Sequence, residues 1–163
     1  MTDPHPALSV VWQGHPTWSA DWIWGLPLIV STVIIHVLGL GFISRRAILL
    51  HVAAEQRRRR YPHFTLAIVL GSSTLLATLL HGIETGIWAI AYVGLGALEN
   101  SRAGMLYSLG AMTTYGNSEL HLAEHWRLLG SIEALNGWLL FGLSTAFLFW
   151  LIQEVSPTRP TTG

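Results

Sequence analysis

The chain has 163 residues, of which 51% are hydrophobic and only 11% are charged, whereas a soluble domain carries about 25% charged residues. Its mean hydropathy is +0.45 and its formal net charge is zero. These values indicate an integral membrane protein and give no sign of a nucleic-acid partner or a soluble substrate. Cysteine is absent, which excludes disulfides, thiol catalysis and thiolate metal sites.

The first elements are an external N-terminal arm at 1–21 and an apolar helix at 22–43 that is long enough to cross a bilayer. The arm has neither a basic residue nor an apolar run, so we do not expect a cleaved signal peptide. An arginine-rich loop at 44–63 follows and carries six of the nine basic residues, which predicts that this loop is cytoplasmic. The arm then lies outside, and four tryptophans at this outer interface fit an aromatic belt: Trp12, Trp18, Trp22 and Trp24.

The next apolar segment, 64–98, is interrupted only by His81 and Glu84. A helix of this length would measure roughly 50 Å, against a hydrocarbon core of about 30 Å. It must therefore tilt, project beyond the bilayer, or break near Gly82 or Gly86. The last span is expected at 128–152, followed by a cytoplasmic tail at 153–163. No segment has the in-out alternation of a membrane β-barrel.

Between these two spans lies an external segment, 99–127, that is not an ordinary loop. Its first half is apolar and predicts a short helix that Asn100 or Ser101 caps and that ends near Met112. Its second half, 114–122, is polar and contains a glycine. A short helix followed by a polar strand between two spans describes a re-entrant pore loop. The predicted fold is thus all-α, with three transmembrane helices plus a re-entrant pore helix and filter loop between the second and third.

Several motifs in this region resemble potassium-channel-type proteins, in particular small bacterial members of the two-helix pore family. The likeness covers roughly 64–153, and the first span is an extra element outside it. It rests on the run Thr113-Thr-Tyr-Gly-Asn-Ser-Glu119 and on matching residues in the flanking helices: His81, Glu84, Trp88, Tyr92, 105–109, Trp126 and 133–137. The resemblance implies an ion-channel pore domain at 64–152 that assembles as a homotetramer.

The resemblance also implies a selectivity filter, which comprises Thr113, Thr114, Tyr115, Gly116, Asn117 and Ser118. The family filter reads T-V-G-Y-G followed by an acidic residue, so this chain keeps Thr114, Gly116 and the acidic Glu119. Ser118 stands in place of the second glycine, where a left-handed backbone costs on the order of 1–2 kcal/mol. Fewer carbonyl sites for a dehydrated ion imply weakened discrimination between K⁺ and Na⁺.

The pore chemistry also follows from elementary electrostatics. A pore helix ending near Met112 directs the negative end of its dipole toward the membrane centre, where a cation needs stabilisation. Glu119, repeated around a fourfold axis, would form an acidic ring that concentrates cations at the outer mouth. We expect a permeant monovalent cation, K⁺ or Na⁺, with no other cofactor and no bound metal.

Ionisable residues inside the spans are candidate functional groups, because burying them is costly. His81, Glu84, Trp88 and Tyr92 share one helix face. They form a brace behind the pore loop or a simple His81–Glu84 pair, or they take part in conduction. Two ligand types on this face could invite zinc, but zinc usually takes three or four ligands.

Several other residues are candidates, and most of them have two possible roles. Glu133 braces the filter or faces water in the pore, and Trp126 supports the loop. Gly137 and Gly142 are candidate gating hinges or positions of close helix packing. His36 is expected to be a packing histidine. His121 and His125 either confer pH sensitivity at the outer mouth or lie in an exposed loop.

These features together predict a passive cation channel in the plasma membrane of a bacterium, with the N-terminus outside and the C-terminus in the cytoplasm. The alternative is a non-conducting membrane scaffold or sensor that retains the pore fold. An enzyme is not expected, because the sequence has no nucleophile–base constellation, no phosphate-binding glycine loop and no three-ligand metal motif. Regularly spaced arginines are missing from the spans, which argues against a voltage sensor.

Overall fold

The computed structural model describes residues 19–53, 62–116 and 118–156, and within these ranges the chain is helical and contains no strand. Four α-helices and one 3₁₀ turn follow one another: α1 (Ser19–Ala53), α3 (Pro62–Gly94), α4 (Ser101–Met112), η1 (Glu124–Trp126) and α5 (Arg127–Val155). Three helices, α1, α3 and α5 with its preceding turn, are long and apolar enough to cross a membrane. The expected all-helical class with three candidate spans is therefore confirmed.

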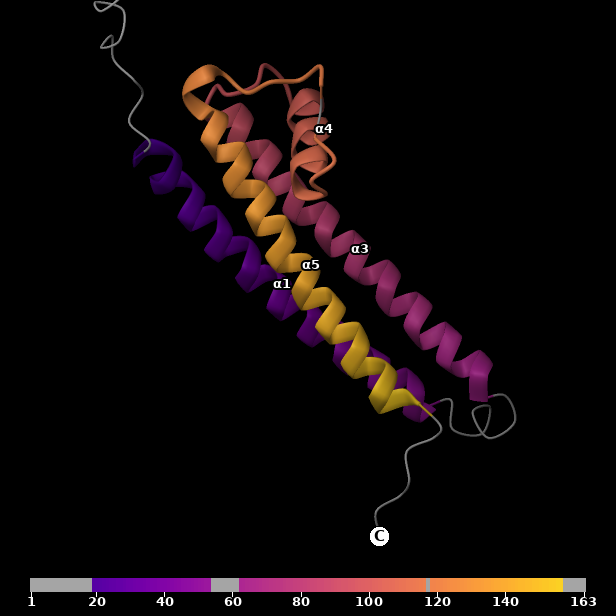
Figure 1. Ribbon diagram of the computed structural model, residues 1–163. Coiled ribbons are helices and arrows are strands. Elements are labelled where there is room, and N and C mark those ends of the chain that lie inside the picture. Colours follow the sequence, from indigo (N-terminus) through magenta and orange to yellow (C-terminus); the bar gives the residue numbers. More distant parts are fainter. Residues whose placement is uncertain (1–18, 54–61, 117, 157–163) are drawn as a thin grey trace, which may run out of the picture.

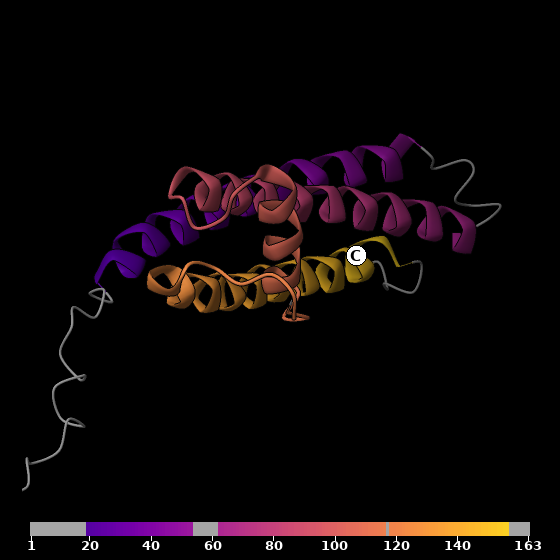
Figure 2. The same cartoon turned by 90° about the horizontal axis from the view of Figure 1, so that it is seen from above.

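The three long helices run side by side in alternating directions, as Figure 1 shows. The start of α1, the end of α3 and the start of α5 lie at one end of the bundle. At this same end α4 turns back along the bundle, and the chain after it returns before α5 begins. From above, α4 bridges α3 and α5 (Figure 2) and packs against both.

In the first half of α1 the buried face is made of polar and small residues, although the helix as a whole is apolar; Leu40 and Ile43 are buried further along. Asp21, Gly25, Thr32 and His36 are buried, whereas many large apolar side chains of α1, such as Leu38 at 69% exposure, point outward. This inverted pattern suits a helix whose outer face meets lipid and whose inner face approaches other helices closely. A Cβ on Gly25 would lie only 2.9 Å from the Ile132 side chain, so glycine permits the contact between α1 and α5.

Small residues also bring α4 close to its neighbours. A Cβ on Gly104 would lie 2.9 Å from the carbonyl oxygen of Ala89 in α3. On the other side, a Cβ on Gly137 of α5 would lie 2.2 Å from the carbonyl oxygen of Met112. Backbone-to-backbone approach at both faces thus fixes α4 between α3 and α5.

The helix boundaries differ from the expected ones for local reasons. α1 continues past 43 to Ala53, so Arg45 and Arg46 lie on a helix; Arg57 to Arg60 lie outside the described residues. α3 is unbroken at Gly82 and Gly86 and ends at Gly94. Gly96 there has φ +66°, and Ala97 N–H donates to the Tyr92 carbonyl at 2.8 Å. This glycine-based cap ends α3 before Leu98.

Candidate functional site

The α4 helix begins as the sequence predicts. The Asn100 side chain accepts a hydrogen bond from Ala103 N–H at 2.9 Å, so Asn100 is the N-cap. The helix ends at Met112, and the Thr113 N–H donates to Leu109 O at 3.1 Å. The predicted short helix is therefore present.

The segment after α4 has an unusual backbone. Thr114 has φ +57° and Gly116 has φ +73°, so two alternate residues are left-handed, and the first of them is not a glycine. The Gly116 N–H donates to the Gly110 carbonyl at 3.0 Å, which folds the segment back onto α4. Tyr115 is 91% exposed, and Asn117, the fifth of the six expected filter residues, lies outside the described residues.

A buried hydrogen-bonded cluster holds α4 to the long helices. The Tyr92 hydroxyl of α3 donates to Glu133 Oε2 of α5 at 2.6 Å. The Ser108 hydroxyl of α4 lies between Glu133 Oε1 and the carbonyl of Thr85, to which it is 2.9 Å distant. Glu133, Tyr92 and Ser108 are fully buried. Glu133 therefore hydrogen-bonds to the body of α4 through Ser108, and none of its hydrogen bonds within the described residues reaches the polar segment that follows.

Aromatic side chains fill the space around this cluster. Trp88, Tyr92 and Trp126 belong to one buried core together with Met112. The Tyr107 ring of α4 meets the Tyr92 ring edge-on, with centroids 5.3 Å apart. Trp88 and Trp126 thus pack at the level of α4, whereas the indole nitrogens of both lack a hydrogen-bond partner among the described residues.

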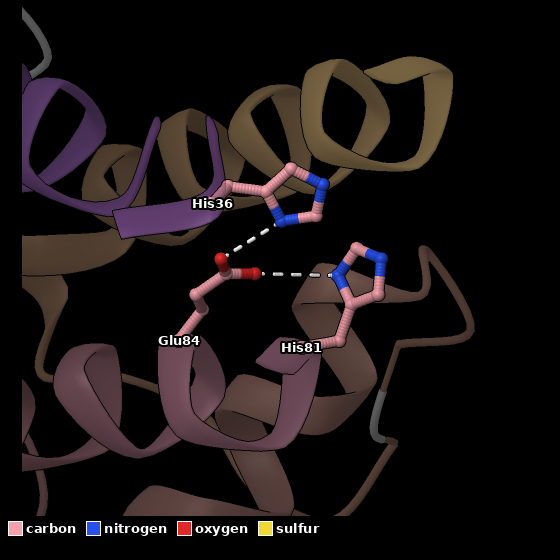
Figure 3. Close-up of side chains that lie close together, drawn as sticks. All are labelled: His36, His81 and Glu84. Carbon is pink, nitrogen blue, oxygen red and sulfur yellow. Dashed lines mark hydrogen bonds and ion pairs between the residues drawn. The ribbon is translucent and has the colours of Figure 1, made fainter. Parts of the chain in front are cut away.

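His81 and Glu84 belong to a different cluster, further along the bundle. Glu84 Oε1 is 2.8 Å from His36 Nδ1 of α1, and Glu84 Oε2 is 3.4 Å from His81 Nδ1. Figure 3 shows the carboxylate between the two imidazole rings. Ser144 Oγ of α5 lies 3.1 Å from the Nε2 atoms of both histidines. This four-residue group, here called the histidine cluster (His36, His81, Glu84 and Ser144), links all three long helices.

Two further polar contacts join α1 to α5. The Leu129 N–H in the first turn of α5 donates to Asp21 Oδ1 at 3.0 Å, so a residue of α1 caps the start of α5. The Asn136 amide donates to Thr32 Oγ1 at 2.9 Å in the buried interior. Together with the contact between His36 and Glu84, these contacts dock α1 onto α3 and α5.

The remaining candidates lie on α5 or in the segment just before it. Gly137 is covered by Met112, whereas a Cβ on Gly142 would meet nothing within 4 Å. Glu119, His121 and His125 are exposed near the start of α5, and the His125 ring lies 5.4 Å from the Trp126 ring.

Sequence reasoning did not identify Asp21, Thr32 or Ser144 as members of a site, and it treated His36 as isolated. A signal was present, because Asp21, Gly25, Thr32 and His36 repeat at intervals of four and seven residues along an otherwise apolar helix. Such a polar stripe marks the face that a membrane helix turns toward protein.

No protein-family model, curated protein or solved structure matches this chain.

Proposed function

We propose that the chain is one subunit of a passive, tetrameric cation channel, in which α4 and the segment after it form a re-entrant pore loop. The proposal combines the resemblance of 64–153 to potassium-channel-type proteins with the arrangement of α4. The transported species is a monovalent cation, and we propose no enzymatic activity.

The observation that carries the proposal is the position of α4. This helix turns back between α3 and α5, is held there by Ser108 and Glu133, and ends at Met112, followed by the exposed polar residues 113–116. The C-terminal end of a helix carries a partial negative charge of about half a unit. A helix that ends partway along a membrane-spanning bundle offers that charge, and the carbonyl groups after it, to a cation.

The unoccupied face of α4 supports assembly into a ring. Met105, Leu106 and Leu109 are 39–49% exposed on α4. Leu106 and Leu109 line, with Tyr115 and Gly116, an open hollow of about 620 Å³. A polar backbone segment beside an apolar helix face is tolerated at membrane depth only when protein or a water-filled pore covers it. Four copies around an axis would supply both.

The expected selectivity is weak. The left-handed backbone at Thr114 and Gly116 supports alternating carbonyl directions in the first half of the filter segment. Ser118 in place of a second glycine removes support for the outer half. Discrimination then depends more on Glu119, which is exposed beyond the segment and attracts cations of either kind.

The distribution of charged and aromatic residues supports an orientation with α4 toward the outside. Arg45 and Arg46 are exposed near the end of α1 that is remote from α4, as a cytoplasmic loop requires. Trp22 and Trp24 are 43% and 50% exposed at the opposite end, where an interfacial belt is expected.

The direct test is K⁺ and Na⁺ flux into liposomes that contain the purified protein, with the oligomeric state measured by cross-linking. We expect tetramers and cation flux with a modest preference for K⁺. Gly116→Asp should abolish the flux, because an aspartate cannot adopt the required backbone without strain and adds a charge inside the pore. His121→Asp adds the same charge outside the filter segment and should preserve the flux. Confirmed tetramers without any flux would refute the channel and favour a scaffold or sensor.

A further inference from the structure

We infer that His36, His81 and Glu84 form a binding site for a divalent transition-metal ion of the zinc class, with Ser144 as the group that orients both histidines. The site is separate from the pore loop and does not depend on conduction. The two ligands on α3, His81 and Glu84, are too few for a zinc site by themselves. The third ligand, His36, comes from α1.

The geometry of the three ligands suits a metal ion. Each offers one atom, and these atoms all lie within 4.8 Å of one another. Around a tetrahedral zinc ion, ligands at about 2.0–2.2 Å from the metal are roughly 3.3 Å apart. The two oxygens of Glu84 lie 3.4 Å from His81 Nδ1 and 2.8 Å from His36 Nδ1, so both imidazole nitrogens already face the carboxylate at distances close to this value.

The hydrogen count of the histidine cluster leaves one nitrogen–oxygen contact, between His81 Nδ1 and Glu84 Oε2, without a hydrogen. The four contacts of the cluster form a closed ring: Glu84 to His36, His36 to Ser144, Ser144 to His81, and His81 back to Glu84. One serine hydroxyl and two neutral imidazoles bring three hydrogens, which serve the three hydrogen bonds of the ring and leave none for the 3.4 Å contact between His81 Nδ1 and Glu84 Oε2. Glu84 Oε2 is the buried oxygen of this ring that has no hydrogen-bond partner among the described residues.

A bound metal ion would give both imidazoles and the Glu84 carboxylate a suitable partner. When both Nδ1 atoms bind the metal, each imidazole carries its hydrogen on Nε2. Both Nε2 atoms lie 3.1 Å from Ser144 Oγ, and a hydroxyl oxygen has two lone pairs to accept them. Metal-binding histidines normally donate their second N–H to such an acceptor.

The ligand types determine the class of metal. Two imidazoles and one carboxylate suit zinc and its first-row neighbours, whereas magnesium and calcium prefer oxygen ligands. Three protein ligands leave a fourth position for water. His36 and Glu84 are fully buried, but the His81 side chain is 23% exposed, so the open position is on the His81 side.

Such a site would cross-link the extra helix to the rest of the chain. His36 belongs to α1, His81 and Glu84 belong to α3, and Ser144 belongs to α5. A bound ion therefore stabilises the packing of α1 against the pair of helices that hold α4.

The test is metal binding to the purified full chain in detergent, without a polyhistidine tag and after removal of metals with a chelator. Zn²⁺ is titrated against a chromogenic chelator, and Co²⁺ is followed by its visible absorption. We expect one saturable ion per chain and a tetrahedral Co²⁺ spectrum. His36→Gln and Glu84→Gln should each abolish stoichiometric binding. Ser144→Ala should keep the stoichiometry and weaken the affinity about 10–100-fold.

The control variant is His125→Gln, which removes an exposed histidine far from the cluster and should leave one ion per chain. Binding that survives His36→Gln and Glu84→Gln would overturn the site, because the ion would then be held elsewhere. Should these two variants fail to fold, His81→Asn, at the partly exposed ligand, replaces them. The absence of a tetrahedral Co²⁺ spectrum from the wild-type protein would also overturn the metal site. A proton between His81 and Glu84 would then take the place of the metal ion.

Discussion

The contact between Gly137 and the end of α4 leads to a quantitative prediction for Gly137→Ala. A Cβ at this position would lie 2.2 Å from Met112 O and 2.9 Å from two other Met112 backbone atoms. Ordinary contact begins near 3.4 Å, so α4 and α5 must separate by about 1 Å, and no flexible side chain can give way instead. Overpacking of this kind destabilises a protein by about 1–3 kcal/mol.

Two other glycines of α5 provide matched controls. A Cβ on Gly142 meets nothing within 4 Å, so Gly142→Ala should stabilise the protein through the helix propensity of alanine, by up to about 1 kcal/mol. A Cβ on Gly130 meets mainly the hydroxyl end of the Tyr107 side chain, at 2.1 Å. Gly130→Ala should therefore have an intermediate effect, because a side chain can move more easily than a backbone.

The assay is unfolding of the detergent-solubilised variants by heat and by a graded series of SDS concentrations, followed by circular dichroism. Gly137→Ala and Gly142→Ala gain the same helix propensity, so the difference between them measures the clash alone. We expect the free energy of unfolding of Gly137→Ala to be lower than that of Gly142→Ala by about 1–3 kcal/mol. Equal stability, or a more stable Gly137→Ala, would refute the close approach of α4 to α5.

Two further predictions use the same unfolding assay. Asp21→Ala removes the side chain that accepts the Leu129 N–H and should cost about 0.5–2 kcal/mol, whereas Asp21→Asn keeps an accepting oxygen and should cost less; identical losses would contradict the capping role. Tyr92→Phe deletes the hydroxyl that donates to Glu133 at 2.6 Å and should cost about 1–3 kcal/mol. Tyr107→Phe, whose hydroxyl makes no hydrogen bond to the described part of the chain, should cost little, and an equal loss would argue against the Tyr92–Glu133 bond.

Local features of this protein are readable in its sequence because they depend on neighbouring residues. Long apolar runs predict three spans, since a helix must satisfy its own backbone in lipid. Asn100 predicts the start of α4, because a short polar side chain can cap the first free N–H groups. The end of α4 near Met112 follows from the change to polar residues and a glycine. The predicted end of the second span at 98 was wrong, because the glycine-based cap at Gly96 ends α3 at Gly94, earlier than its apolar character suggests.

Only the tertiary structure decides how distant residues meet. Asp21 caps a helix that begins 106 positions later in the chain, and His36 reaches Glu84 and Ser144, which belong to two other helices. An apolar helix can in principle pack with any of its faces, because lipid solvates every apolar face equally well. The polar stripe of α1 selects one face, but its partners are chosen by the complementary groups on α3 and α5. For the same reason the third ligand of the inferred metal site emerges only when the helices are packed together.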